Sequence, residues 1–209
     1  MRVIKIGSPS EVVLRKQLLA PNKKKMELHN KWTVFIHYHS HSANYGNAYK
    51  EIGSFETVEE FWNLYNNIPT VNSIYNNTLY ESNAAVIAYS VFRYGIKPEW
   101  EDIINSNGAE WGCRQEMTET LFHDLWKNAL LGAIGENFDC VGVRAINKSS
   151  KTRILHKIEI WMSTTNEDQC KKTLHDFQEI NDITIPEFTL MLHTEKYQQA
   201  IEFQNKKKR

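Results

Sequence analysis

A tryptophan and a glutamate stand side by side in the segment GIKPEWED, residues 95–102. Gly95 and Pro98 are residues that mark turns, so Trp100 is expected in a turn rather than within a regular element. An indole in such a place either folds back onto the core or offers its ring to a ligand. A ring that stacks on a planar ligand, beside a carboxylate that accepts hydrogen bonds from the ligand's edge, can bind a single nucleotide base.

Guanine suits this pair better than the other bases do. Its N1–H and its N2 amino group point in the same direction, so the single carboxylate of Glu101 can accept a hydrogen bond from each. Adenine, cytosine and uracil offer no such pair of donors. Trp100 and Glu101 therefore predict a site for guanine.

A second candidate for chemistry is a run of cations without an acid between residues 144 and 157. Such a run is often no more than a solvated loop. Beside a guanine site, the same run predicts a clamp for phosphate groups. Its members are Arg144, Lys148, Lys151, Arg153 and Lys157.

Composition limits what kind of protein can carry these residues. The chain has 209 residues, of which 41% are hydrophobic and 24% are charged, and this predicts one globular domain without a linker. The formal net charge is zero, so any anion site must be a local concentration of Lys and Arg. We expect no non-specific attraction to a long polyanion.

The three cysteines are widely spaced and lack the spacing of metal ligands, so neither a disulfide framework nor a zinc site is predicted. No run of about 18 apolar residues and no secretory leader is found. The sequence thus predicts a cytoplasmic protein that does not span a membrane, and a monomer without a cofactor or a metal.

Hydrophobic periodicity predicts the elements that must position the site. Thr57 and Glu60 form a capping box at the start of an amphipathic helix, and in this helix and the next the spacing of Trp62 and Trp126 favours a place in the core. Residues 69–86 are rich in Asn and predict a long loop or insertion. Helices are predicted over 57–68, 116–135 and 166–181, strands over 32–39, 49–55, 88–95, 140–146, 156–164 and 187–194, and a short helix in the tail.

This order of elements predicts an α+β fold, in which helices pack on one face of a mainly antiparallel sheet and leave the other face free. We expect an N-terminal extension over 1–29, one domain over 30–195 and a basic tail over 196–209.

Six segments, in order along residues 30–195, resemble the eukaryotic translation initiation factor 4E family, which binds the 7-methylguanosine cap of messenger RNA. Each segment alone is a weak signal, but their order and spacing together are specific. The resemblance implies a curved sheet with three helices on its convex face and the cap in its concave face. The segments are NKWTVFIHY, FETVEEFWNLYNNI, YSVFRYGIKPEWED, LWKNALLGAIGENFD, VGVRA and KIEIWMST.

The resemblance also implies roles for individual residues. Trp100 becomes one of two rings that sandwich the methylated base, and Glu101 becomes the carboxylate on its N1 and N2 donors. Tyr45 falls where the second ring is expected, although the family usually has Trp there. Methylation at N7 leaves a positive charge on the base, and a tyrosine ring can still stack on such a cation. Trp161 would contact the N7 methyl group.

For the phosphates, the resemblance implies Arg144 and Lys157, and we add Arg153 and Lys148 from the same basic run. Glu110 stands where the family usually carries a basic residue. An acid there would repel the phosphates unless the 146–156 loop compensates.

A helical partner is also implied for the convex face. Val58, Trp62 and Leu131 match the positions that grip the amphipathic helix of a scaffold factor or a regulatory protein. We therefore expect Trp62 to remain partly exposed. Lys127 and Asn128 replace an apolar residue and an acid that are usual beside this surface.

We thus predict a cap-binding protein, not an enzyme, that recruits the initiation machinery through a scaffold partner and has no catalytic residues. One alternative is a repressive cap-binding homologue that does not recruit the scaffold. Another is a hydrolase of caps or nucleotides, but such chemistry needs acids clustered around a metal, and the acids here occur as scattered pairs.

Overall fold

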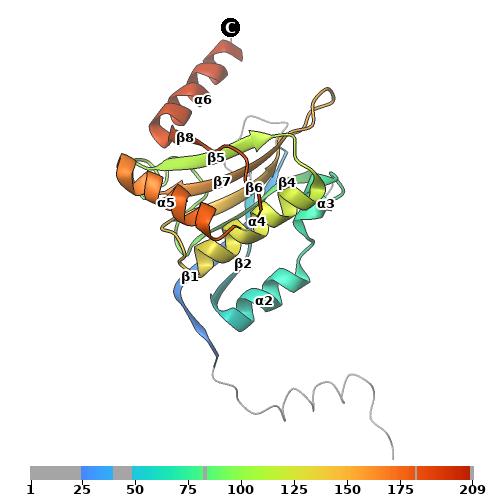
Figure 1. The fold of residues 1–209 in the computed structure, drawn as a ribbon. Coiled ribbons are helices and arrows are strands. Elements are labelled where there is room, and N and C mark those ends of the chain that lie inside the picture. The colour runs from blue at the N-terminus through green and yellow to red at the C-terminus, as the bar shows by residue number, and fades with distance from the viewer. Residues whose placement is uncertain (1–24, 40–48, 82–83, 182, 208–209) are drawn as a thin grey trace, which may run out of the picture.

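The computed structural model describes residues 25–39, 49–81, 84–181 and 183–207 (Figure 1). Its strands are β1 (Glu27–Tyr38), β2 (Tyr49–Thr57), β3 (Tyr80–Glu81), β4 (Ala84–Arg93), β5 (Ala109–Gln115), β6 (Gly142–Asn147), β7 (His156–Met162) and β8 (Thr189–Leu192). Its helices are α2 (Val58–Asn67), α3 (Val71–Tyr75), α4 (Glu119–Ile134), α5 (Glu167–Glu179) and α6 (His193–Lys207).

The strands form one curved antiparallel sheet in the order β2-β1-β4-β6-β7-β5-β8, and the short β3 pairs with β4 outside this path. The pairs β1–β2 and β6–β7 are the two predicted hairpins. Helices α2, α4 and α5 lie on the same face of the sheet (Figure 1). The predicted α+β class is therefore confirmed. α6 is the predicted tail helix, and α3 is an addition to the predicted helices.

The core lies between the sheet and these helices. Strand alternation sends Ile158 and Ile160 of β7 toward α4, where Leu125 and Ala129 are fully buried. The intervening side chains of β7 point to the opposite side of the sheet. This side is called the front face below, and it carries Lys157, Glu159 and Trp161.

Local capping explains where the helices begin. The Thr57 hydroxyl accepts a hydrogen bond from the Glu60 amide at 3.2 Å, as the capping box predicts. Thr118 and Asn166 cap α4 and α5 in the same way. Within the described part of the chain, no helix is long and apolar enough to cross a membrane.

The prediction of a loop over residues 69–86 is wrong. This segment contains α3, in which Val71 and Ile74 are buried, and it leads into β3 and β4. Asn147 donates hydrogen bonds to the carbonyls of Ile74 and Tyr75, at 2.8 and 3.2 Å. Contacts with a distant strand therefore order a segment that has no clear periodicity of its own.

Three elements differ from the predicted ones. β5 was not predicted, because Gly112 and three charged or polar residues interrupt its apolar alternation. β1 begins at Glu27, within the last residues of the expected N-terminal extension. The tail helix α6 begins at His193, directly after β8. This early start places the first turn of α6 against the sheet.

Candidate functional site

The loop that carries Trp100 and Glu101 is held by buried polar side chains. Gly95, with φ of +87°, turns the chain away from β4. Asn105 is fully buried, and its Nδ2 donates to the carbonyls of Lys97 and Glu99, both at 2.8 Å. Asp102 accepts hydrogen bonds from the amides of Lys97 and Ile104, both at 2.9 Å. The loop is thus built to hold its tip in one conformation.

Within this loop, Trp100 and Glu101 have different surroundings. Trp100 is half-buried and packs against the apolar cluster of Phe35, Phe92 and Trp161, while it also lines a groove on the front face. Trp100 therefore folds back onto the core and also presents part of its surface to the groove. Glu101 is exposed and makes no hydrogen bond or ion pair with any described residue. Its carboxylate is free to accept hydrogen bonds from a ligand.

The groove has a volume of about 810 Å³ and lies between the front face of the sheet and α6. Its size suits a nucleotide. Its charged lining consists of Arg114, Arg144, Lys148, Lys157, Glu159, Glu187 and Lys196.

A buried charge network forms the floor of this groove. Lys157 Nζ lies 2.7 Å from Glu110 Oε1 and is also paired with Glu159. Arg144 lies 3.2 Å from Glu159 Oε2. Glu110 is fully buried, and Glu159 is 3% exposed. Two of the four predicted phosphate-binding cations, Arg144 and Lys157, are thus already paired with carboxylates.

The pKa shifts follow from this network. Burial raises the pKa of Glu110, and the charge of Glu159 adds to the effect. For Glu159, burial is outweighed by the charges of Lys157 and Arg144, which hold its pKa well below the usual range. Burial likewise opposes the charge on Lys157, but the two carboxylates raise its pKa above the ordinary value. Lys157 and Glu159 therefore form a firmly charged pair at neutral pH.

Gly112 makes this arrangement possible. It faces Glu159 across the β5–β7 pair. A Cβ at Gly112 would lie 2.9 Å from Lys157 Cε, closer than a real contact allows. The missing side chain at Gly112 leaves room for the Lys157 side chain to pass over this residue and reach Glu110.

Trp161 lies beneath the groove, and neighbouring side chains cover its ring. Its ring is fully buried, with Phe92 at 5.3 Å and His193 at 4.4 Å between ring centres. Its Nε1 donates to Glu159 Oε2 at 2.9 Å, and the Arg144 guanidinium lies 5.4 Å from the ring centre. Contact between Trp161 and a methyl group on a ligand requires these side chains to move.

Lys148 and Arg114 are the groove cations that lack an acid partner among the described residues. Lys148 is exposed, yet desolvation of its ammonium group lowers its pKa. The charge of Glu159 opposes this shift, while the charges of Arg144 and Lys157 add to it. A cation held among other cations marks a position where an anion would be stabilised. Lys148 was among the predicted phosphate-binding residues, whereas Arg114 was not.

Two predicted residues are not brought into the groove. Arg153 is exposed on the turn between β6 and β7, which is closed by a hydrogen bond from the Ser150 amide to the Arg153 carbonyl at 2.8 Å. Tyr45, predicted as the second ring of the sandwich, lies outside the described residues. Its role stays a prediction.

Sequence reasoning missed the part of the site that α6 supplies. His193 is fully buried, and its Nδ1–H donates to the Asn105 carbonyl at 2.7 Å. One turn later, Lys196 is paired with Glu110. No local sequence pattern indicates this pair. An acid that becomes buried needs a cation beside it, but this need does not identify which cation.

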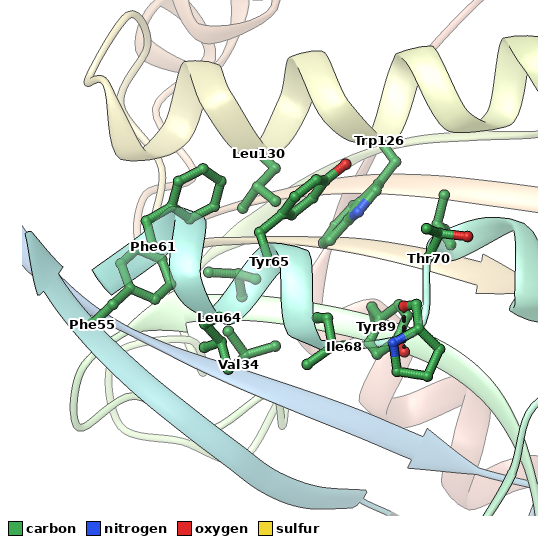
Figure 2. Close-up of a pocket in the computed structure, with 13 residues that line it drawn as sticks. Val34, Phe55, Phe61, Leu64, Tyr65, Ile68, Thr70, Tyr89, Trp126 and Leu130 are labelled. Carbon is green, nitrogen blue, oxygen red and sulfur yellow. Dashed lines mark hydrogen bonds between the residues drawn. The ribbon is translucent and has the colours of Figure 1, made fainter. Parts of the chain in front are cut away.

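On the opposite face of the sheet, α2 and α4 enclose an apolar cleft. Figure 2 shows Tyr65 of α2 beside Trp126 and Leu130 of α4, above Val34 of the sheet. The cavity between them is about 30 Å³, so the helices leave little empty space.

Beside this cleft, the predicted partner-binding residues are available at the surface. Trp62 is 39% exposed and packs edge-on against Phe61 and Tyr65. The expectation that it remains partly exposed is confirmed, and the core position that its helical spacing favoured is correct for Trp126 but not for Trp62. Val58 and Leu131 are half-buried. Asn128 donates a hydrogen bond to Asn181 Oδ1 at 2.8 Å, which ties α4 to the residues after α5. This contact accounts for an amide at that position, whereas Lys127 is exposed.

The fold and the groove define a class of protein: a single antiparallel sheet with helices on one face and a cationic, aromatic-edged ligand groove on the other. The family described as eukaryotic initiation factor 4E matches residues 27–209. The chain therefore belongs to the eukaryotic initiation factor 4E family.

Curated relatives agree with this assignment. Eukaryotic translation initiation factor 4E-2 of Schizosaccharomyces pombe is 31% identical over 160 residues, which cover 75% of this chain and 62% of that protein. Eukaryotic translation initiation factor 4E1 of Drosophila melanogaster is 34% identical over 151 residues, which cover 69% of this chain and 53% of that protein. The chain thus spans little more than half the length of these relatives.

Solved structures share the fold. Caenorhabditis elegans eIF4E-3, in a complex with the 4E-binding protein Mextli and a cap analog, matches with a TM-score of 0.69 and 22% identity over 83% of this chain and 96% of that one. Ascaris suum eIF4E-3, in a complex with the m7G cap, matches with a TM-score of 0.68 and 23% identity over 82% of this chain and 93% of that one.

Proposed function

We propose that this protein binds the 7-methylguanosine cap of messenger RNA in the groove on the front face. The observation that carries the proposal is the half-buried Trp100 at the groove, followed by Glu101, which is exposed and unpaired among the residues that the structure describes. Family membership and the cap complexes of the two eIF4E-3 structures support it.

Each part of the cap meets a suitable group. Trp100 stacks on the methylated base, whose positive charge is attracted to the face of an aromatic ring. Glu101 accepts hydrogen bonds from the N1–H and N2 amino group, and it selects guanine because no other base presents both donors on one side. Tyr45 is proposed as the ring on the other side of the base.

In the proposed complex, the phosphates lie in a groove where most of the cations are already paired with carboxylates. Arg144 and Lys157 carry charge into the floor, but Glu159 and Glu110 already hold them. Within the described parts of the chain, Lys148 has no such partner. We therefore assign the phosphates first to Lys148, with Arg144 and Lys157 acting through their field as well as by direct contact. Arg153, on the turn outside the groove, is proposed to contact a more distant phosphate. We propose that binding uncovers the Trp161 ring, which then contacts the N7 methyl group.

For the convex face, we propose that Val58, Trp62 and Leu131 bind an amphipathic helix of a scaffold initiation factor or a regulatory protein. The exposed Trp62 supports this because a large aromatic side chain on the surface is typical of an interface anchor. Mextli in the Caenorhabditis elegans complex is described as a 4E-binding protein. Recruitment of the scaffold is our first proposal, and repression without recruitment is the second, favoured by Lys127 and Asn128.

We propose no enzymatic activity. Among the described residues, no group of three or more His, Cys, Asp or Glu side chains could hold a metal ion. A cap hydrolase of the metal-dependent type would need such a group beside the phosphates.

Retention on immobilised 7-methylguanosine tests the cap proposal. The protein should bind the resin and elute with free 7-methylguanosine triphosphate but not with GTP. Elution by both nucleotides would remove the methyl-specific part of the proposal, and failure to bind would remove the proposal itself. A pull-down with a scaffold subunit from the same source separates recruitment from repression.

A further inference from the structure

Glu110 places a buried negative charge under a groove that is proposed to hold phosphates. It is fully buried in β5, where it faces Trp161 across the β5–β7 pair. Together with Glu159 it pairs Lys157, and Glu159 also pairs Arg144. Two cations and two carboxylates cancel, so these four side chains alone give the floor no net charge to attract a phosphate.

Lys196 changes that balance. Its ammonium group is paired with Glu110 Oε1, and its side chain is 11% exposed and lines the groove. With Lys196 included, three cations face two carboxylates, and the network carries one net positive charge. The 146–156 loop was the expected source of compensation for Glu110, but the structure draws the compensating charge from α6.

The helix that carries Lys196 is joined to the sheet by strand pairing and by hydrogen bonds of its first residue. β8 pairs with β5 immediately before α6 begins. The His193 amide donates to the Gly108 carbonyl at 3.0 Å, and the His193 ring donates to Asn105, in the loop that carries Trp100. Lys196 follows His193 by three residues, so both lie on the same side of the helix.

The same side of α6 continues along the groove. His193, Lys196, Ala200 and Phe203 follow one another at steps of three or four residues, and the last three line the groove. Tyr197 and Ile201 lie on the other side of the helix, and Phe203, the last residue of the groove side, is 61% exposed. The helix therefore presents one continuous face to the ligand site.

We propose that α6 is a wall of the ligand groove. Glu110 and Glu159 neutralise Lys157 and Arg144, and Lys196 supplies the phosphate-binding charge that these two cations would otherwise provide. This inference rests on the proposed cap-binding function. It assigns to α6 a part in discrimination between nucleotides with one phosphate and nucleotides with three.

Calorimetric titration of 7-methylguanosine monophosphate and triphosphate tests the proposal. Lys196→Ala should weaken triphosphate binding roughly tenfold, as expected for loss of one charge-assisted contact, and monophosphate binding by less. Lys196→Arg should restore most of the difference because it keeps the charge. Lys206→Ala, at the exposed end of the same helix, should bind both nucleotides as the parent does.

Glu110→Gln separates a ligand contact from a purely structural ion pair. If Glu110 competes with phosphate for Lys196 and Lys157, its neutral replacement should bind the triphosphate more tightly than the parent, opposite in sign to Lys196→Ala. Weakening by both substitutions would identify the pair as structural and overturn the proposal. Thermal unfolding of each variant confirms that the compared proteins are folded.

The remaining outcomes are also decisive. If Lys196→Ala leaves triphosphate binding unchanged, or strengthens it because α6 obstructs the groove, the proposal is wrong while cap binding stands. If the parent binds neither methylated nucleotide, cap binding is wrong. The wall is then tested with inorganic tripolyphosphate, which needs no base recognition. Binding that Lys196→Ala weakens supports the wall, and absence of binding by the parent overturns it.

Discussion

Replacement of Glu101 by Ala isolates the proposed guanine contact from the fold. Glu101 is exposed and makes no hydrogen bond or ion pair within the described chain, so its removal takes nothing from the folded protein. In the complex, its carboxylate accepts two hydrogen bonds. Charge-assisted hydrogen bonds contribute about 1.5–3 kcal/mol each, and exposure to water places this pair toward the lower end. We expect a loss of about 2–4 kcal/mol, which is roughly 30- to 700-fold in Kd.

The neighbouring Asp102 provides the matched control. Its carboxylate accepts from the amides of Lys97 and Ile104, so Asp102→Ala should disturb the loop and lower the melting temperature as well as the affinity. Glu101→Ala should keep the melting temperature of the parent within about 1 °C, because surface substitutions away from such contacts change stability little. Titration of 7-methylguanosine triphosphate by fluorescence measures both affinities. Parental affinity in Glu101→Ala would refute the assignment of this carboxylate.

Four further predictions concern other parts of the molecule. Tyr45→Ala should weaken binding of the methylated nucleotide by about 1–3 kcal/mol and Tyr45→Trp should strengthen it, because indole offers a cation the better face; unchanged affinities would remove Tyr45 from the site. Trp62→Ala should lower the affinity for a scaffold helix by more than about 1 kcal/mol and leave nucleotide affinity unchanged, and a pull-down with equal recovery would argue against this surface. Gly112→Ala should displace Lys157 and weaken triphosphate binding, whereas a crystal structure with the Lys157 ion pairs intact would contradict this. Burial lowers the pKa of His193 to about 4, so the unfolded chain binds more protons below pH 6.5 and stability is lost as the pH falls; urea unfolding at pH 7 and pH 5 should show about 2 kcal/mol less of this loss in His193→Gln than in the parent, and equal losses would be inconsistent with a buried neutral ring.

Elements with strong local signals were predictable from the sequence. The start of α2 depends on Thr57 and Glu60, which are three residues apart, and both hairpin strands of β6–β7 have clear β-branched runs. Trp100 and Glu101 could be recognised because they are adjacent in the chain, and their chemistry requires only that adjacency.

Features that depend on distant contacts could not be predicted in this way. Ordering of α3 requires Asn147, which is more than 70 residues away in the chain. Glu110 and Lys196 are 86 residues apart, and nothing in their local sequence indicates the pair. Trp161 was expected at the ligand, but the arrangement of His193 and Arg144 over its ring is set by tertiary packing.

Titration of the unmodified protein with 7-methylguanosine triphosphate and with GTP, followed by tryptophan fluorescence, tests the central claim most directly. Stacking of the methylated base on Trp100 should quench the emission, and the positive charge on the base should make binding of the methylated nucleotide at least about tenfold tighter than that of GTP. Equal affinity for the two nucleotides, or no quenching by either, would contradict the account.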